Sequence, residues 1–334
     1  MKSIVLGVLM LSWIAFSASA ATPGSCAAKK KIIHNWTHAS LDGIDLEYQV
    51  QGAGEPVVFV HAGVFAEWFE PLMVEPALSK RYCLVTYHRI GYAGSTHVAG
   101  LMSIEQQAAQ LRSLLVHLGI ERAHVVGHSS GALIALQLAL AAPESVLSLS
   151  LLEPALTVPS ISASQESARK SGVASAIERY RAGDRPGAVD MFMRTVAGPD
   201  YRAALDSVLP QAFAHAVADA ETFFEQELPA VRAWSFREED AKRVRQPVLA
   251  VIGARSREVS PIWQQRQNLL IAWLPKVEAF ELADATHLLH VQNSRDMAQR
   301  LAAFFSRHSL QESDVKGEGG RPLKPAVATP PPRQ

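Results

Sequence analysis

The sequence lacks an excess of charge of either sign. Its 334 residues carry 32 Lys and Arg against 32 Asp and Glu, so the formal net charge is zero. Proteins that bind nucleic acid usually concentrate basic residues, because contacts to phosphates supply much of their affinity. The balance therefore argues against a nucleic-acid partner. With 48% hydrophobic and 19% charged residues, the chain is also too apolar to be disordered throughout.

Cysteine is scarce, with two residues in the whole chain. Two are too few for a disulfide scaffold or for a zinc site built on cysteines, and we expect no metal site. Cys83 stands in a strand-like run, Tyr82–Tyr87, which favours a buried thiol. The alternative is a disulfide between Cys26 and Cys83, which an oxidising compartment would permit.

Beyond its N-terminus the sequence has no long hydrophobic run. Residues 1–20 combine Lys2, an apolar run over 4–16 and a small-residue cleavage site at 18–20. This pattern is typical of a secretory signal peptide. An uncleaved anchor, the alternative, needs about 20 apolar residues. We therefore expect an exported protein, periplasmic or secreted, with no stable membrane span after cleavage.

The rest of the chain divides into a foldable body and its flanks. Residues 21–35 are expected to be a flexible segment, and 309–334, with five prolines and no apolar periodicity, a disordered tail. Residues 36–156 and 242–308 are the two predicted parts of one core. Between them, 157–241 are helical in pattern, which predicts a cap. This cap carries 9 basic and 13 acidic residues, which mildly disfavours anionic substrates.

Short apolar runs alternate with helical patterns along the body. The runs are nearly continuous in Val, Leu and Ile, as strands buried on both faces require. This alternation predicts a mostly parallel α/β sheet with helices on both faces, opened by an antiparallel hairpin around Asp42-Gly43. The expected strands are 57–60, 84–87, 124–126, 146–152, 247–252 and 277–282, and the clearest helices are 104–118, 131–142 and 297–305.

Ser129 lies in the most informative segment, Gly127-His128-Ser129-Ser130-Gly131. An apolar strand runs into this Gly-x-Ser-x-Gly turn, and a helix follows at once. The glycines permit a tight turn that exposes the serine hydroxyl, and the helix N-terminus favours developing negative charge. Ser129 is therefore the predicted nucleophile.

Together with three further segments, this turn resembles the α/β-hydrolase superfamily over roughly residues 36–307. One of them, 151–154, resembles the end of the family's strand six. Tyr87–Ser95 is similar to the family's Asp-Arg-x-Gly-x-Gly-x-Ser loop, with His88 in place of Asp, and 283–287 resembles the turn that carries the catalytic histidine. The resemblance implies an α/β-hydrolase fold with a helical cap inserted after strand six. It also implies His287 as the general base, in preference to His290.

An oxyanion hole needs two backbone N–H groups aimed at the developing alkoxide. Ser130, which follows the nucleophile, is expected to supply one. His61-Ala62-Gly63 occupies the place of the family's His-Gly loop, with Ala62 where glycine is usual. Gly63 is then the expected second donor.

The acid departs from the family pattern. Ser256 stands in the loop after strand seven where most members carry Asp, and a serine cannot hold an imidazolium by charge. Two carboxylates can replace it. Glu153, at the end of strand six, is preferred because a carboxylate there is hard to explain as a surface residue, and Glu258 is the alternative acid.

These residues predict an esterase-like serine hydrolase that needs no cofactor. Ser at the nucleophile position argues against the dehalogenase and epoxide hydrolase chemistry of this fold, which uses Asp. The expected substrate is a small, largely apolar molecule with an ester or related acyl bond. The alternative is a non-hydrolytic ligand-binding or sensor protein on the same fold, which the Ser256 position motivates.

Overall fold

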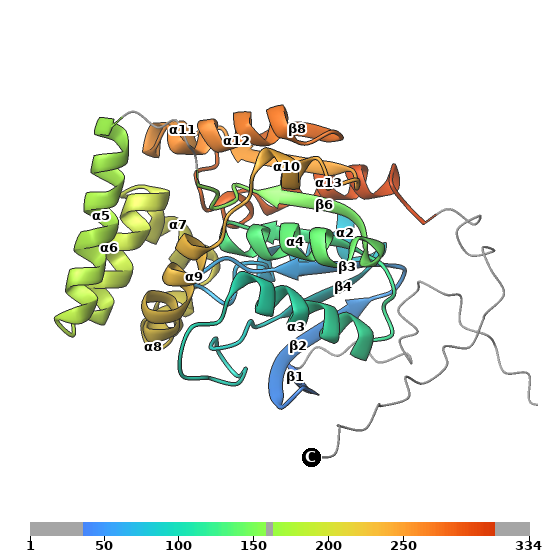
Figure 1. Ribbon diagram of the computed structural model, residues 1–334, viewed down its shortest axis with the longest axis horizontal. Helices are drawn as coiled ribbons and strands as arrows, with labels where there is room; N and C mark the ends of the chain where they lie inside the picture. Colours follow the sequence, from blue (N-terminus) through green and yellow to red (C-terminus); the bar gives the residue numbers. More distant parts are fainter. Residues whose placement is uncertain (1–35, 158–162, 311–334) are drawn as a thin grey trace, which may run out of the picture.

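The computed structural model describes residues 36–157 and 163–310, which are built around one sheet. Its strands are β1 (Thr37–Leu41), β2 (Ile44–Gly52), β3 (Glu55–Val60), β4 (Tyr82–Tyr87), β5 (Ala123–His128), β6 (Val146–Leu152), β7 (Val248–Gly253) and β8 (Val277–Leu282). They lie in the order β1-β2-β4-β3-β5-β6-β7-β8 (Figure 1). β1, β2 and β4 pair antiparallel, and every other pair is parallel. The predicted mostly parallel sheet and its opening hairpin are confirmed.

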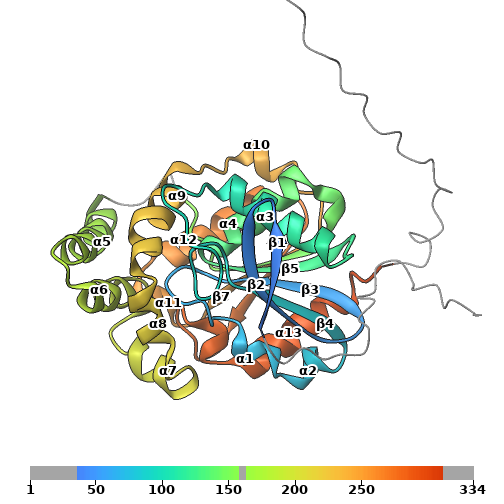
Figure 2. The ribbon, with the colours of Figure 1, turned by 90° about the horizontal axis from the view of Figure 1, so that it is seen from below.

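Helices cover both faces of the sheet because its strands are apolar on both sides. In β3, Val57 and Phe59 pack into one core, and Val58 and Val60 pack into the other, as the alternation of side chains along a strand requires. The first core lies under α1 (Glu70–Met73), α2 (Pro76–Ser79) and α13 (Ser294–Ser306), and the second under α3 (Ile104–His117), α4 (Ser130–Ala141) and α12 (Ile262–Trp273). Figure 2 shows these two groups of helices on opposite sides of the sheet.

A helical insertion separates β6 from β7. It contains α5 (Ala163–Arg181), α6 (Arg185–Ala197), α7 (Tyr201–Val208), α8 (Ala212–Ala218), the π-helix η2 (Thr222–Glu227), α9 (Leu228–Ala233) and α10 (Glu238–Ala241). No strand occurs among its described residues. α5 to α9 gather at one side of the sheet (Figure 1). The predicted cap after strand six is therefore present.

Cys83 corrects one expectation. Its side chain is fully buried in β4, as the strand pattern predicted, but it is disulfide-bonded and is not a free thiol. Burial within a strand predicts an apolar environment and does not exclude a bonded partner. The chain's other cysteine, Cys26, lies outside the described residues, as do the predicted signal peptide and the tail from residue 311.

Within the described ranges, no helix is long and apolar enough to cross a membrane.

Candidate active site

Three parallel strands bring the predicted catalytic residues to one edge of the sheet. Ser129 directly follows β5, Glu153 directly follows β6, and His287 lies in the loop after β8. Because the carboxyl ends of parallel strands share an edge, residues far apart in the sequence meet there. The connection after β3, which contains Gly63, reaches the same edge.

The turn at Ser129 is strained, and its glycines make it possible. Ser129 has φ 51° and ψ −114°, a conformation that costs a residue with a side chain about 1–3 kcal/mol. A Cβ on Gly131 would lie 2.2 Å from the carbonyl oxygen of Val60, and one on Gly127 would lie 2.6 Å from the Cα of Ala132. Helix α4 can approach β3 and β5 this closely only because both positions are glycine.

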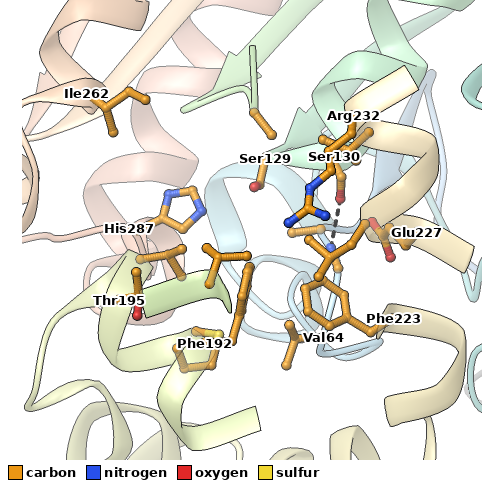
Figure 3. A pocket seen from close by; sticks show the side chains of 18 of the residues that line it. Val64, Ser129, Ser130, Phe192, Thr195, Phe223, Glu227, Arg232, Ile262 and His287 are labelled. Atoms are coloured by element: carbon orange, nitrogen blue, oxygen red, sulfur yellow. Dashed lines mark hydrogen bonds between the residues drawn. The ribbon is translucent and has the colours of Figure 1, made fainter. Parts of the chain in front are cut away.

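His287 is held by Glu153. The imidazole Nδ1 lies 2.6 Å from Glu153 Oε2, and Glu153 Oε1 accepts a hydrogen bond of 2.8 Å from the backbone N–H of Gly253. Both side chains are buried, at 3% and 2% exposure. With Nδ1 bonded to the carboxylate, Nε2 is the ring nitrogen left to accept a proton. Figure 3 shows the His287 ring and the Ser129 hydroxyl directed into the same space.

The surroundings of His287 favour the neutral form of its imidazole. Burial lowers the pKa of its imidazole below the ordinary value of 6.5, and the neighbouring Glu153 only partly opposes this. The indole of Trp263 contributes to the burial, since it stacks on the imidazole with ring centroids 3.9 Å apart. A general base has to be unprotonated before it can act, so this environment suits a base that works near neutral pH.

The alternative acid lies apart from this pair. Glu258 is on α11 (Ser256–Val259), where its exposed carboxylate pairs with Arg255 at 3.2 Å. Ser256 is fully buried, and its hydroxyl has no hydrogen-bond partner among the described residues. Of the two candidate carboxylates, the structure brings Glu153 to His287.

Gly63 and Ser130, the two predicted oxyanion donors, are in direct contact. The Gly63 N–H donates to the Ser130 hydroxyl at 2.9 Å, a bond drawn in Figure 3. The amide therefore points toward the nucleophile turn, where a substrate oxygen can replace or share the hydroxyl. A Cβ on Gly63 would lie 2.7 Å from the ring of Phe223 in η2, so the cap also requires glycine there.

The other buried histidines near Ser129 form a hydrogen bond or ring contacts with neighbouring residues of the core. His61 accepts a hydrogen bond of 2.9 Å from the backbone N–H of Arg89 through Nε2. His290 stacks on Phe69 with ring centroids 4.5 Å apart, and burial lowers its pKa to about 3. His128 packs edge-on against the indole of Trp68 and lies beside His287, the candidate general base. Burial lowers the pKa values of His61 and His128 as well.

A buried ion pair that sequence analysis missed joins the cap to the core. Arg89, in the loop after β4, bonds to Glu227 of η2 at 2.7 Å, and the Tyr92 hydroxyl donates to the same carboxylate. Thr222 adds a hydrogen bond of 2.6 Å to the carbonyl of Gly91. Arg89 and Glu227 are 138 residues apart, so no local pattern indicated the pairing. Arg89 stood in a recognised motif loop, but nothing in the sequence named its partner.

The cap and the core enclose a cavity of about 580 Å³ above Ser129. Ser129 and His287 lie at its floor, and apolar side chains from both parts form most of its wall. The wall includes Ala62, Val64, Trp68, Leu156, Phe192, Met193, Val196, Phe223, Leu228, Val231, Ile262 and Trp263. Concave sites with apolar walls and few polar groups are typical of small-molecule binding. Within the described ranges, no group of three metal-ligating side chains occurs.

Comparison with known proteins identifies relatives of the same fold. The family described as alpha/beta hydrolase fold matches residues 55–294. A putative carbamate hydrolase, RutD, of Azorhizobium caulinodans is 37% identical over 108 residues, which are 32% of this chain and 40% of that protein. The dihydrolipoyllysine-residue acetyltransferase component of the acetoin cleaving system of Cupriavidus necator is 34% identical over 142 residues, 42% of this chain and 37% of that protein. The matches therefore span less than half of each relative.

Solved structures agree in fold. An esterase from Thermogutta terrifontis superposes with a TM-score of 0.68 at 16% identity, covering 82% of this chain and 100% of that one. The carboxylesterase CesB from Bacillus subtilis gives a TM-score of 0.64 at 18% identity, covering 81% and 90%. At these identities the likeness concerns the fold alone.

Proposed function

The chain belongs to the α/β-hydrolase fold family, and from that premise we propose that it is a serine hydrolase that cleaves ester or related acyl bonds of small molecules. One observation carries this proposal. A buried carboxylate, Glu153, holds Nδ1 of His287 at the floor of a cavity that also contains the strained Ser129. This is the arrangement in which a serine hydroxyl becomes a nucleophile.

The reaction proceeds through an acyl-enzyme. His287 Nε2 removes the proton of the Ser129 hydroxyl as Oγ attacks the acyl carbon. The negative charge of Glu153 stabilises the imidazolium that forms, while the N–H groups of Gly63 and Ser130 stabilise the oxyanion. The imidazolium then gives its proton to the leaving group. A water molecule, activated by the same imidazole, releases the acid and restores Ser129.

The cavity supports a small substrate with a largely apolar body. Its walls come from the cap and from the segment around Trp263, and its floor holds the reacting groups. The alternative of a non-hydrolytic sensor was motivated by Ser256 in the usual place of the acid. Because Glu153 bonds to His287, the residue at position 256 no longer favours that alternative. The pattern of residues 1–20 leads us to place this hydrolase outside the cytoplasm, in the periplasm or secreted.

A fluorophosphonate probe and short 4-nitrophenyl esters test the proposal on the same preparations. The wild type is expected to hydrolyse the esters and to be labelled at Ser129. Ser129→Ala is expected to lose both properties, while Ser207→Ala, an exposed serine of α7, keeps both. Unchanged turnover or labelling in the Ser129 variant would refute the assignment.

A further inference from the structure

Two guanidinium groups reach the largely apolar cavity. Arg232 comes from α9 of the cap, and Arg266 comes from α12 of the core. Arg266 is buried, with its Nε donating to the carbonyl oxygen of Leu156 at 2.7 Å. Arg232 forms no hydrogen bond, ion pair or ring contact within the described part of the chain. Among the described residues, the cavity is thus lined by a solvent-exposed cation, Arg232, that no side chain neutralises.

The carboxylates near the cavity are already engaged. Glu153 is bonded to His287, and Glu227, which also lines the cavity, is bonded to Arg89 and to the Tyr92 hydroxyl. Neither is therefore available to Arg232.

The acidic excess of the cap lies elsewhere. Of the acidic residues that the structure describes in the cap, Glu227 alone lines the cavity, and others such as Glu221 and Glu225 are exposed on the outer surface. The expectation that an acidic cap disfavours anionic substrates rested on the sum of its charges. Inside the cavity, the uncompensated charge is positive.

The position of Arg232 indicates which end of a bound substrate would lie beside it. In Figure 3 its guanidinium points into the cavity, on the side of Ser129 away from His287. His287 has to give its proton to the leaving group, so the leaving group lies on the His287 side of Ser129. The acyl chain then extends toward Arg232.

We propose that Arg232 binds a carboxylate at the far end of the acyl chain, so that the preferred substrates are half-esters of dicarboxylic acids. This rests on the proposed serine hydrolase function and names its substrate class. The apolar walls accommodate the methylene chain between the two ends. A guanidinium matches a carboxylate in geometry as well as charge, because two parallel N–H groups can donate to its two oxygens.

Matched pairs of substrates test the preference for a carboxylate separately from the serine hydrolase function on which it rests. Each 4-nitrophenyl half-ester of glutaric, adipic or pimelic acid is compared with the uncharged 4-nitrophenyl alkanoate of equal chain length. The wild type is expected to show a higher kcat/KM for the charged member. In Arg232→Gln this preference should fall about tenfold through a selective loss of kcat/KM on the charged ester, the effect of one charge-assisted hydrogen bond at an exposed site.

Two controls accompany the comparison. Arg245→Gln removes an exposed arginine that does not line the cavity, and it should leave the preference unchanged. Arg232→Lys keeps the charge but not the paired donors, and it should retain part of the preference. Added salt should weaken hydrolysis of the charged ester alone.

Equal kcat/KM for both members of each wild-type pair would overturn the inference. So would an equal loss on both esters in Arg232→Gln, which would indicate a structural role. In either case, Ser129-dependent hydrolysis of the uncharged esters would leave the serine hydrolase proposal standing. Absence of all hydrolysis would refute both the serine hydrolase proposal and the half-ester preference.

Discussion

Replacing Glu153 with glutamine removes the charge behind His287 and keeps nearly the same side-chain shape. The amide can still accept the Gly253 N–H bond that orients the carboxylate in the wild type. In the proposed mechanism, what the amide cannot do is stabilise the imidazolium that forms as His287 takes the serine proton. The variant therefore isolates the electrostatic contribution of Glu153 to the transition state.

The size of the effect follows from the buried contact. The Nδ1–Oε2 distance of 2.6 Å places the two charge centres somewhat farther apart than the bonded atoms. Two unit charges about 4 Å apart, at an effective dielectric constant of about 20, attract by about 4 kcal/mol. That corresponds to a loss in kcat of about 10³-fold, with KM changing little because the charge develops only in the transition state.

The assay is steady-state hydrolysis of 4-nitrophenyl butyrate, with far-UV circular dichroism to establish that each variant is folded. Glu258→Gln is the matched control, because Glu258 is exposed and pairs with Arg255 on α11. It should remain within about twofold of the wild type, as expected for an exposed ion pair. If the folded Glu153 variant keeps more than a tenth of the wild-type kcat, the reasoning is refuted. A larger loss at Glu258 would move the acid to the loop after β7.

Two further predictions concern the cap and the base. Glu227→Gln leaves Arg89 buried without a counter-charge and should lower the free energy of unfolding by about 3 kcal/mol or more, measured by urea titration. Glu221→Gln, which breaks an exposed ion pair of the cap, should lower the free energy of unfolding by less than about 1 kcal/mol. Equal losses of stability in the two variants would contradict this prediction. Trp263→Ala admits water to His287, so the pKa of the imidazole should rise toward 6.5. Since the neutral imidazole is the active form, the acidic limb of the pH profile of kcat/KM should move to higher pH in this variant. Trp263→Phe, which keeps an aromatic ring, should leave the limb nearly in place. An unmoved limb in the alanine variant would contradict this account.

The central fold could be predicted because its signals are local. A buried parallel strand needs a continuous apolar run, and a tight strand-to-helix turn needs small residues at fixed spacing. The strands, the cap after β6 and the turn at Ser129 followed from such patterns. The bonding state of Cys83 did not, because a strand pattern reports the burial of a side chain and not its covalent partner.

The sequence by itself predicted the nucleophile turn, the histidine after the last strand, and two carboxylates as candidates for the third role. Only the tertiary structure decided between Glu153 and Glu258, because both follow strands that end at the same edge and only the packed side chains reveal which one meets His287. It also decided that Arg89 pairs with Glu227 and that Arg232 faces the cavity with no partner in the described part of the chain. Such contacts join residues far apart in the chain, and they depend on how the cap packs on the sheet, which no local pattern encodes.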